Sequence, residues 1–218
     1  KEIPLNSVVV ILKDRQYNNE NGLVQFTIKI KNQSLNEKVN LDFEVREKTN
    51  PTKIMDSKVT KVTNSDYIIS TKLAGKWEAL SLTVLDKNTD GESKGSVKLY
   101  SDIRDININN DLKERGINEY TVEVIENEIK DIQKEIEEIN IIISTKNSKI
   151  NLFKENITTL ENDKQYQTAS ELEATENTIK SNQASILQLE SEIKIESEKC
   201  KEYEEKIKKL EEKKKNYQ

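Results

Sequence analysis

The 218-residue chain contains no histidine and a single cysteine, Cys200. Histidine is the usual general base near neutral pH, and both zinc sites and cysteine nucleophiles need partners that this sequence lacks. One cysteine also leaves no intramolecular disulfide. We therefore expect no catalytic residue, no metal site, no cofactor and no small-molecule substrate, and we interpret the protein as non-enzymatic.

Proline and glycine are scarce, with two and five copies, which favours long uninterrupted elements. No run approaches the roughly 18 apolar residues of a membrane span. Residues 1–118 carry 19 Lys and Arg against 17 Asp and Glu, and residues 119–218 carry 16 against 23. Neither part is basic enough to indicate a nucleic-acid partner.

The first half of the chain alternates apolar and polar residues, as strands with one buried face do. Two such runs are regular: Val24, Phe26, Ile28 and Ile30, then Val39, Leu41, Phe43 and Val45. Less regular strands are expected over residues 8–12, 54–62, 67–71, 77–85 and 96–100. Seven short strands without a helical period predict an antiparallel β-sandwich, Ig-like or similar, over residues 1–106.

Two features of this half have competing interpretations. Trp77 opens an apolar strand and is interpreted as a core side chain, with ligand stacking as the alternative. Residues 86–91 read as a hairpin loop in which Gly91 takes positive φ. Their alternating Asp86, Asn88 and Asp90 resemble a calcium loop, but the twelfth position, where an EF-hand needs Glu, is Val97.

Residues 107–118 read as a polar linker, and residues 119–218 lack proline and glycine. Beyond Val122 an apolar residue recurs at alternating steps of three and four, the period of a coiled-coil seam, with Lys146 as one lapse. The predicted seam is Ile125, Ile129, Ile132, Ile136, Ile139, Ile143, Ile150, Phe153, Ile157, Leu160, Leu172, Ile179, Ile186, Leu189, Ile193, Cys200, Tyr203, Ile207 and Leu210.

The seam shifts phase between Leu160 and Leu172. A capping-box spacing lies in the same interval, as Thr168 with Glu171 or Ser170 with Glu173. We expect a turn near residues 162–168 and a two-helix antiparallel coiled-coil hairpin. One continuous helix that absorbs the shift as a stutter and pairs with other chains is the alternative.

Four apolar residues fall outside the seam: Ile141, Ile142, Leu187 and Ile195. With a turn centred near residue 166, cross-helix partners would have residue numbers summing to about 332, which gathers the four near the middle of the hairpin. Because a two-helix hairpin does not bury such positions, they form a candidate partner surface, with scattered exposure as the alternative. We expect protein partners, including self-association.

The order of features over residues 8–106 resembles the N-terminal domain of phage baseplate upper proteins, the BppU family. The similarity rests on residues 23–31, 41–46 and 55–71, on Ala74-Gly75-Lys76-Trp77, and on Val97-Lys98-Leu99-Tyr100. The resemblance implies a small β domain that docks onto the phage tail and is followed by helices that carry receptor-binding proteins.

The sequence thus indicates a structural or assembly protein, with a phage tail or baseplate component as the first interpretation. A bacterial surface adhesin fragment, with an Ig-like domain on a coiled-coil stalk, is the main alternative. A carbohydrate-binding module is the second, and it would need exposed aromatic residues on one sheet face. The expected location is the virion or the cell surface.

Overall fold

A computed structural model describes residues 2–6, 8–32, 40–88 and 90–218. The predicted strand residue Val39 and the predicted loop residue Thr89 lie outside these ranges. The chain divides into two compact units, Lys1–Thr121 and Val122–Gln218.

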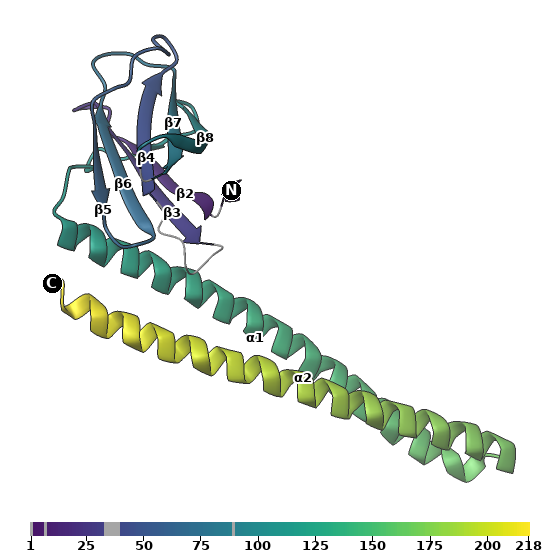
Figure 1. The fold of residues 1–218 in the computed structure, drawn as a ribbon. Helices are drawn as coiled ribbons and strands as arrows, with labels where there is room; N and C mark the ends of the chain where they lie inside the picture. The colour runs from purple at the N-terminus through teal and green to yellow at the C-terminus, as the bar shows by residue number, and fades with distance from the viewer. Residues whose placement is uncertain (1, 7, 33–39, 89) are drawn as a thin grey trace. The chain divides into compact units, whose positions relative to one another are not determined.

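The first unit is built from two antiparallel sheets packed as a sandwich (Figure 1). One sheet has the order β1-β2-β3-β6-β5, with β9 beside β2, and the other has the order β4-β7-β8. The strands are β1 (Glu2–Leu5), β2 (Val8–Tyr17), β3 (Leu23–Asn32), β4 (Asn40–Glu47), β5 (Ser57–Lys61), β6 (Asp66–Lys72), β7 (Ala79–Lys87), β8 (Ser93–Asp102) and β9 (Asn107–Ile108). All seven predicted strands are present.

Alternation of side chains explains the core. In β3, Val24, Phe26, Ile28 and Ile30 are all buried, and they join buried residues of the other sheet, such as Val45 and Leu82, in one apolar cluster. Trp77 belongs to this cluster and meets the Tyr17 ring edge-on at 5.3 Å between centroids. Its interpretation as a core side chain is confirmed.

The hairpin loop between β7 and β8 is also confirmed, and Gly91 takes φ +84°. Asp86 lies at the end of β7 and accepts a hydrogen bond from Asn6 Nδ2 at 2.8 Å. One of the carboxylates of the calcium-like pattern is therefore occupied in joining the two sheets.

The prediction of a polar linker over residues 107–118 is wrong, because this segment packs on the sandwich. Strand β9 pairs in parallel with β2, and Asn18 Nδ2 donates to the carbonyls of Asn110 and Leu112 at 2.8 and 3.0 Å. Leu112 is buried. The polar side chains here satisfy backbone groups, so a polar sequence does not mean a free linker.

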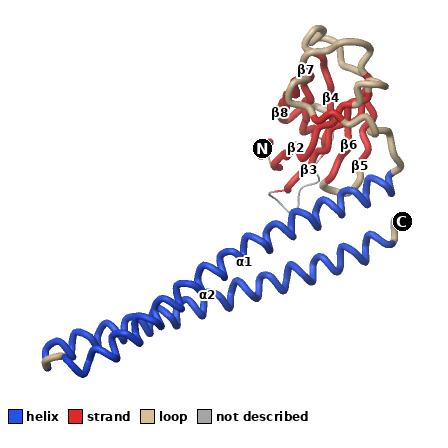
Figure 2. The backbone as a smooth tube through the Cα atoms, turned by 180° about the vertical axis from the view of Figure 1, so that it is seen from behind, coloured by secondary structure: helices blue, strands red, loops and turns tan. Residues whose placement is uncertain are grey.

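The two long helices are α1 (Ile117–Asp163) and α2 (Ala169–Lys215), joined by a short 3-10 helix over Lys164–Tyr166. They run antiparallel as a hairpin (Figure 2), which confirms the predicted fold class. The turn lies within the predicted residues 162–168. Of the two predicted capping boxes, the chain uses the one formed by Thr168 and Glu171.

Every predicted seam residue of the hairpin is buried or half-buried. Two polar residues, Thr175 and Asn182, occupy buried positions of the same seam in α2. Within the described ranges, no helix combines the length and the apolar character that a membrane crossing requires.

Candidate protein-binding surface on the helical hairpin

Side chains of opposite charge face each other at the open end of the hairpin. Residues 122–138 of α1 carry seven acidic and two basic side chains, whereas residues 206–215 of α2 carry six Lys and two Glu. Glu128 pairs with Lys206 at 2.7 Å and Glu126 with Lys214 at 3.4 Å. Both side chains of the first pair are partly exposed, so each pair contributes little stability alone. The pairs serve mainly to align α1 with α2.

The cross-helix contacts also fix the register. Residue numbers of partners sum to between 334 and 340, as in Glu128–Lys206, Lys146–Glu192 and Lys164–Glu176. The value of about 332 expected from a turn centred at residue 166 is therefore too small. The 3-10 turn and the capping box place the centre of the hairpin near residue 169.

Lys146, the lapse in the predicted seam, is satisfied across the hairpin. Its Nζ lies 3.0 Å from Glu192 Oε2, and its side chain is 19% exposed. The pKa of Glu192 lies below its ordinary value, because Gln188 donates a hydrogen bond to it and Lys146 pairs with it. A seam lysine at this point selects an acidic partner and thereby reinforces the register.

The four residues of the predicted partner surface are all exposed: Ile141 at 62%, Ile142 at 42%, Leu187 at 67% and Ile195 at 64%. They do not gather at one height, however. In the observed register Ile142 lies level with Ile195, whereas Leu187 lies level with Leu152. The prediction that groups Leu187 with Ile141 and Ile142 is wrong, because it assumes that the residue numbers of cross-helix partners sum to about 332.

Sequence reasoning missed Leu152, which is 65% exposed. The signal was available, since a leucine two residues after the seam residue Ile150 cannot face the partner helix. It was overlooked because it lies apart from the isoleucines in sequence. It lies ten residues after Ile142 on the same helix, roughly 15 Å along its axis.

Heptad positions divide these residues between the two sides of the hairpin. Glu128 and Lys206 both occupy g positions, and their ion pair shows that the g positions of the two helices border the same side. Position c neighbours g on that side. Ile142, Leu152 and Ile195 occupy g, c and c, whereas Leu187 occupies b and lies on the opposite side.

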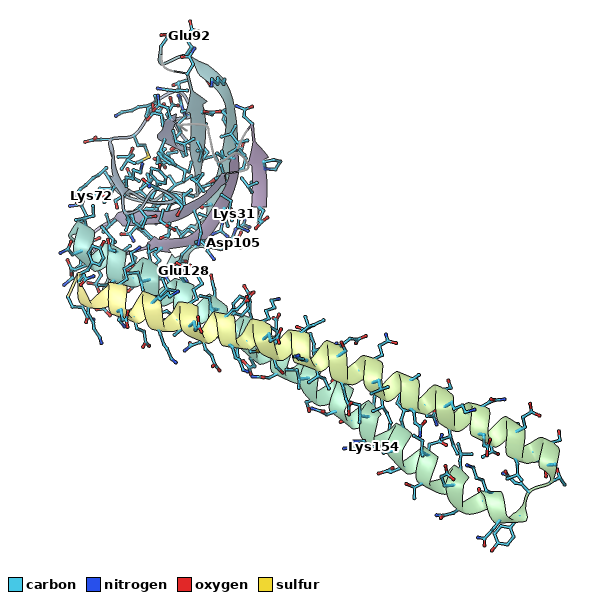
Figure 3. The ribbon with its side chains drawn as sticks, turned by 60° about the horizontal axis from the view of Figure 1, so that its bottom comes forward. Lys31, Lys72, Glu92, Asp105, Glu128 and Lys154 are labelled. Atoms are coloured by element: carbon cyan, nitrogen blue, oxygen red, sulfur yellow. The ribbon has the colours of Figure 1, made fainter. Side chains whose placement is uncertain are left out.

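We call the part of this side that runs from Ile142 to Thr159 on α1 and from Thr178 to Ile195 on α2 the g/c face. It carries only two charged residues, Lys149 and Glu192, among twelve. The densely charged open end contrasts with it, and Figure 3 marks the two regions of α1 by Glu128 and Lys154. The g/c face consists of Ile142, Thr145, Lys149, Leu152, Asn156, Thr159, Thr178, Ser181, Ser185, Gln188, Glu192 and Ile195.

The β-sandwich offers less to a ligand. Six of the seven aromatic residues of the first unit are buried, and Tyr100 alone, at 69% exposed, reaches the surface. A depression of about 610 Å³ beside it is lined by mixed charges, including Arg15 and Asp105. Arg15 Nη1 donates to the Tyr100 carbonyl at 2.9 Å. One exposed tyrosine does not form the aromatic platform that a carbohydrate-binding module needs.

Among the described residues, no three Asp, Glu or Cys side chains gather closely enough to hold a metal ion.

No protein-family model matches the chain, and no curated protein matches it. Two solved structures resemble part of the chain. A DUF4426 family protein from Pseudomonas aeruginosa shares 7% identity, with a TM-score of 0.33 over 47% of this chain and 96% of that one. A DUF4785 family protein from Legionella pneumophila shares 12% identity, with a TM-score of 0.30 over 46% of this chain and 28% of that one. At these TM-scores neither resemblance bears on function.

Proposed function

We propose that the protein is a non-enzymatic structural or assembly protein. In this proposal its β-sandwich docks on one partner, and its helical hairpin presents the g/c face to another protein chain. One observation carries the proposal: every predicted seam residue of the hairpin is buried or half-buried within the chain, whereas Ile142, Leu152 and Ile195 are exposed on one outer side.

The contrast between seam and outer face supports protein binding. An exposed leucine or isoleucine is ordinary when isolated, but several on one face of an elsewhere highly charged rod indicate a contact surface. The seam cannot supply that contact because it is already closed. A rod of two 47-residue helices, each about 70 Å long at 1.5 Å per residue, also suits a spacer between partners.

The setting we propose is a phage tail or baseplate, which follows from the resemblance of residues 8–106 to the BppU family. There the β-sandwich would dock on the tail, and the hairpin would take the place of the helices that carry further proteins. A bacterial surface adhesin would use the same architecture, with the hairpin as a stalk.

Immunogold electron microscopy distinguishes the two settings. An antibody raised against the whole chain would be applied to phage particles purified from induced cultures of the source strain, and to intact cells of the same strain. Label at the tail tip of the particles supports the proposal. Label on the cell wall, with unlabelled particles, overturns it in favour of the adhesin.

A further inference from the structure

The two sheets of the β-sandwich differ in width. In the described part of the chain, one sheet follows the path β1-β2-β3-β6-β5, whereas the other contains only β4, β7 and β8, with β4 and β8 at its edges. Because neighbouring strands lie about 4.8 Å apart, the wide sheet extends past the narrow one. The chain treats the two edges of the narrow sheet differently.

The β4 edge is covered by the chain itself. The Met55 N–H donates a hydrogen bond of 2.8 Å to the Val45 carbonyl, and Asn50 forms a β-bridge with Glu47. Met55 also packs against the apolar core. Backbone groups at this edge therefore have partners within the molecule, which is one way that proteins protect an edge strand.

Strand β8 presents backbone groups that point out of the sheet. Hydrogen bonds alternate along an antiparallel pair, and the bond of 2.9 Å from the Ile103 N–H to the Glu78 carbonyl fixes the alternation between β7 and β8. Ser96, Lys98 and Tyr100 accordingly direct their N–H and C=O groups away from β7. An added strand pairs with backbone groups of this kind.

A depression of about 610 Å³ lies beside this edge, and Ile3, Leu12 and Leu99 are among the residues that line it. Ile3 and Leu12 belong to the wide sheet and pack against the apolar core, yet both are only half-buried. The depression thus lies where a fourth strand of the narrow sheet would cover these two side chains.

The charges around the depression are mainly basic. Its charged lining consists of Lys13, Arg15, Lys98, Asp14 and Asp105. Both carboxylate oxygens of Asp14 accept hydrogen bonds, from the Arg15 N–H at 2.8 Å and from Gln16 Nε2 at 2.6 Å. The Arg15 guanidinium itself donates to a neutral acceptor, the Tyr100 carbonyl, at 2.9 Å. A chain that enters the depression therefore meets positive charge from Arg15 and Lys98.

We propose that β8 binds an extended acidic segment of another protein, which adds to the narrow sheet as a fourth, antiparallel strand. The outward backbone groups of β8 supply the pairing, and the half-buried Ile3 and Leu12 supply apolar contact. Arg15 and Lys98 attract the acidic side chains.

The lysines of β8 argue against a second copy of this strand as the partner. Lys94 and Lys98 both lie on its solvent-facing side. Antiparallel pairing of two β8 strands through their outward backbone groups would set Lys98 directly or diagonally opposite a lysine of the other copy. Like charges at such positions destabilise a strand pair, whereas opposite charges stabilise it.

The added strand specifies how the β-sandwich docks, and it rests on the proposed function in taking this domain as a docking element. The two proposals are tested apart. Label on phage tails, with a β8 edge that binds no strand, contradicts the strand addition alone. Strand addition with unlabelled particles contradicts the phage setting alone.

Hydrogen–deuterium exchange of the full chain, measured by NMR for each amide, tests the strand addition. The probe is a synthetic peptide of about ten residues in which valine alternates with glutamate or threonine. Without peptide, the amides of Ser96 and Lys98 should exchange faster than those of Val97 and Leu99, which bond to β7. With peptide, Ser96 and Lys98 should slow by at least ~10-fold. The Val59 amide on the edge strand β5 should not change.

Two N-methylated peptides separate backbone pairing from charge attraction. In an antiparallel pair, the glutamate and threonine amides of the peptide face β8, because residues that exchange hydrogen bonds have their side chains on the same face of the sheet. Methylation of these amides should abolish the protection of Ser96 and Lys98, whereas methylation of the valine amides should preserve it. Equal protection by both methylated peptides would overturn the added strand.

A charge reversal tests the acidic character of the segment. Lys98→Glu should weaken binding of the acidic peptide by about fivefold, because an attraction becomes a repulsion of similar size. It should strengthen binding of a peptide that carries lysine in place of glutamate. Lys72→Glu, at an exposed position on β6, is the matched control and should change neither affinity. Circular dichroism checks that both variants keep the fold.

Two results would overturn the proposal outright. One is an acidic peptide that leaves the exchange of Ser96 and Lys98 unchanged in the wild-type chain. The other is equal protection by the acidic and the lysine-containing peptides, because the edge would then have no preference for an acidic segment.

Discussion

The hydroxyl of Tyr120, in the first turn of helix α1, donates a hydrogen bond of 3.0 Å to Oε1 of Gln25 on strand β3. Both side chains are 2% exposed, and the backbone N–H of Arg115 donates to the same hydroxyl at 3.2 Å. The start of α1 therefore belongs to the β-sandwich unit, and a buried polar pair anchors it there.

Tyr120→Phe should destabilise the protein by ~1–3 kcal/mol, because the buried Gln25 oxygen loses its donor while the ring stays in place. Urea unfolding followed by near-ultraviolet circular dichroism measures the change. Tyr166→Phe is the control, since Tyr166 is 83% exposed in the turn and its change should stay within about 0.5 kcal/mol. Equal effects of the two substitutions would show that the Tyr120 hydrogen bond is unimportant.

Gly22→Ala should destabilise the β-sandwich more than Gly75→Ala does. Both glycines have positive φ, +72° and +95°, so both substitutions carry a backbone cost of ~1–2 kcal/mol. A Cβ on Gly22 would additionally lie 2.3 Å from the carbonyl oxygen of Leu73, whereas one on Gly75 meets nothing within 4 Å. Thermal unfolding compares the two, and an equal loss would mean that the chain relaxes freely around Gly22.

Thr168→Ala should destabilise the helical hairpin by ~1 kcal/mol, because Thr168 forms the capping box that starts α2. Its backbone N–H and its hydroxyl both donate to Glu171 Oε2, at 2.8 and 2.7 Å. Ser170→Ala alters the competing capping-box candidate and should have little effect. Urea unfolding followed by circular dichroism at 222 nm measures the stability of both variants. A larger loss of stability in Ser170→Ala than in Thr168→Ala would contradict this assignment.

The same contact predicts a pH dependence. The hydrogen bonds from the Thr168 backbone and side chain hold the pKa of Glu171 below its ordinary value of 4.5. The stabilising effect of this carboxylate is therefore complete above pH 4.5 and is lost as the pH falls through the lowered pKa. Thr168→Ala removes the hydroxyl donor and keeps the backbone N–H, so carbon-13 NMR titration should show the pKa of Glu171 rising part of the way towards its ordinary value. An unchanged pKa would show that the Thr168 hydroxyl does not contribute.

Asn182→Leu should stabilise the hairpin by ~1–2 kcal/mol. Asn182 occupies a seam position at 9% exposure, and its Nδ2 has no hydrogen-bond partner among the described residues. Replacing a buried unpaired amide by an apolar side chain of similar size removes its desolvation cost. Asn177→Leu, at an exposed position, should change stability by less than about 0.5 kcal/mol. A thermal melt in which Asn182→Leu lowers the midpoint would show that the amide makes a contact that the leucine cannot replace.

Local periodicity carried most of the fold prediction. The two-residue period located the central strands such as β3, and the alternating steps of three and four located the seam from Ile125 to Leu210. Both signals come from burial of one face of an element, which the sequence records directly. The Thr168 capping box refined the same interval because it is also a local pattern.

Contacts distant in sequence were not predictable in this way. Strand β9 has two residues and is held by pairing with β2 and by Asn18, which lies 92 positions from Asn110. The register of the hairpin depends on the exact geometry of the turn, and a shift of a few residues separated Leu187 from Ile141 and joined Ile142 to Ile195. Register is a tertiary property, so the partner surface could be anticipated only in part.

The g/c face remains for another chain only if the hairpin closes its own seam. Spin labels on Glu128→Cys and Lys206→Cys, in a Cys200→Ser chain diluted with unlabelled protein, measure the distance within one molecule by pulsed electron resonance. The hairpin predicts a single distance below about 25 Å, since packed helix axes lie roughly 8–10 Å apart. A continuous helix would separate the two positions by about 117 Å at 1.5 Å per residue, and the absence of the short distance would contradict the account.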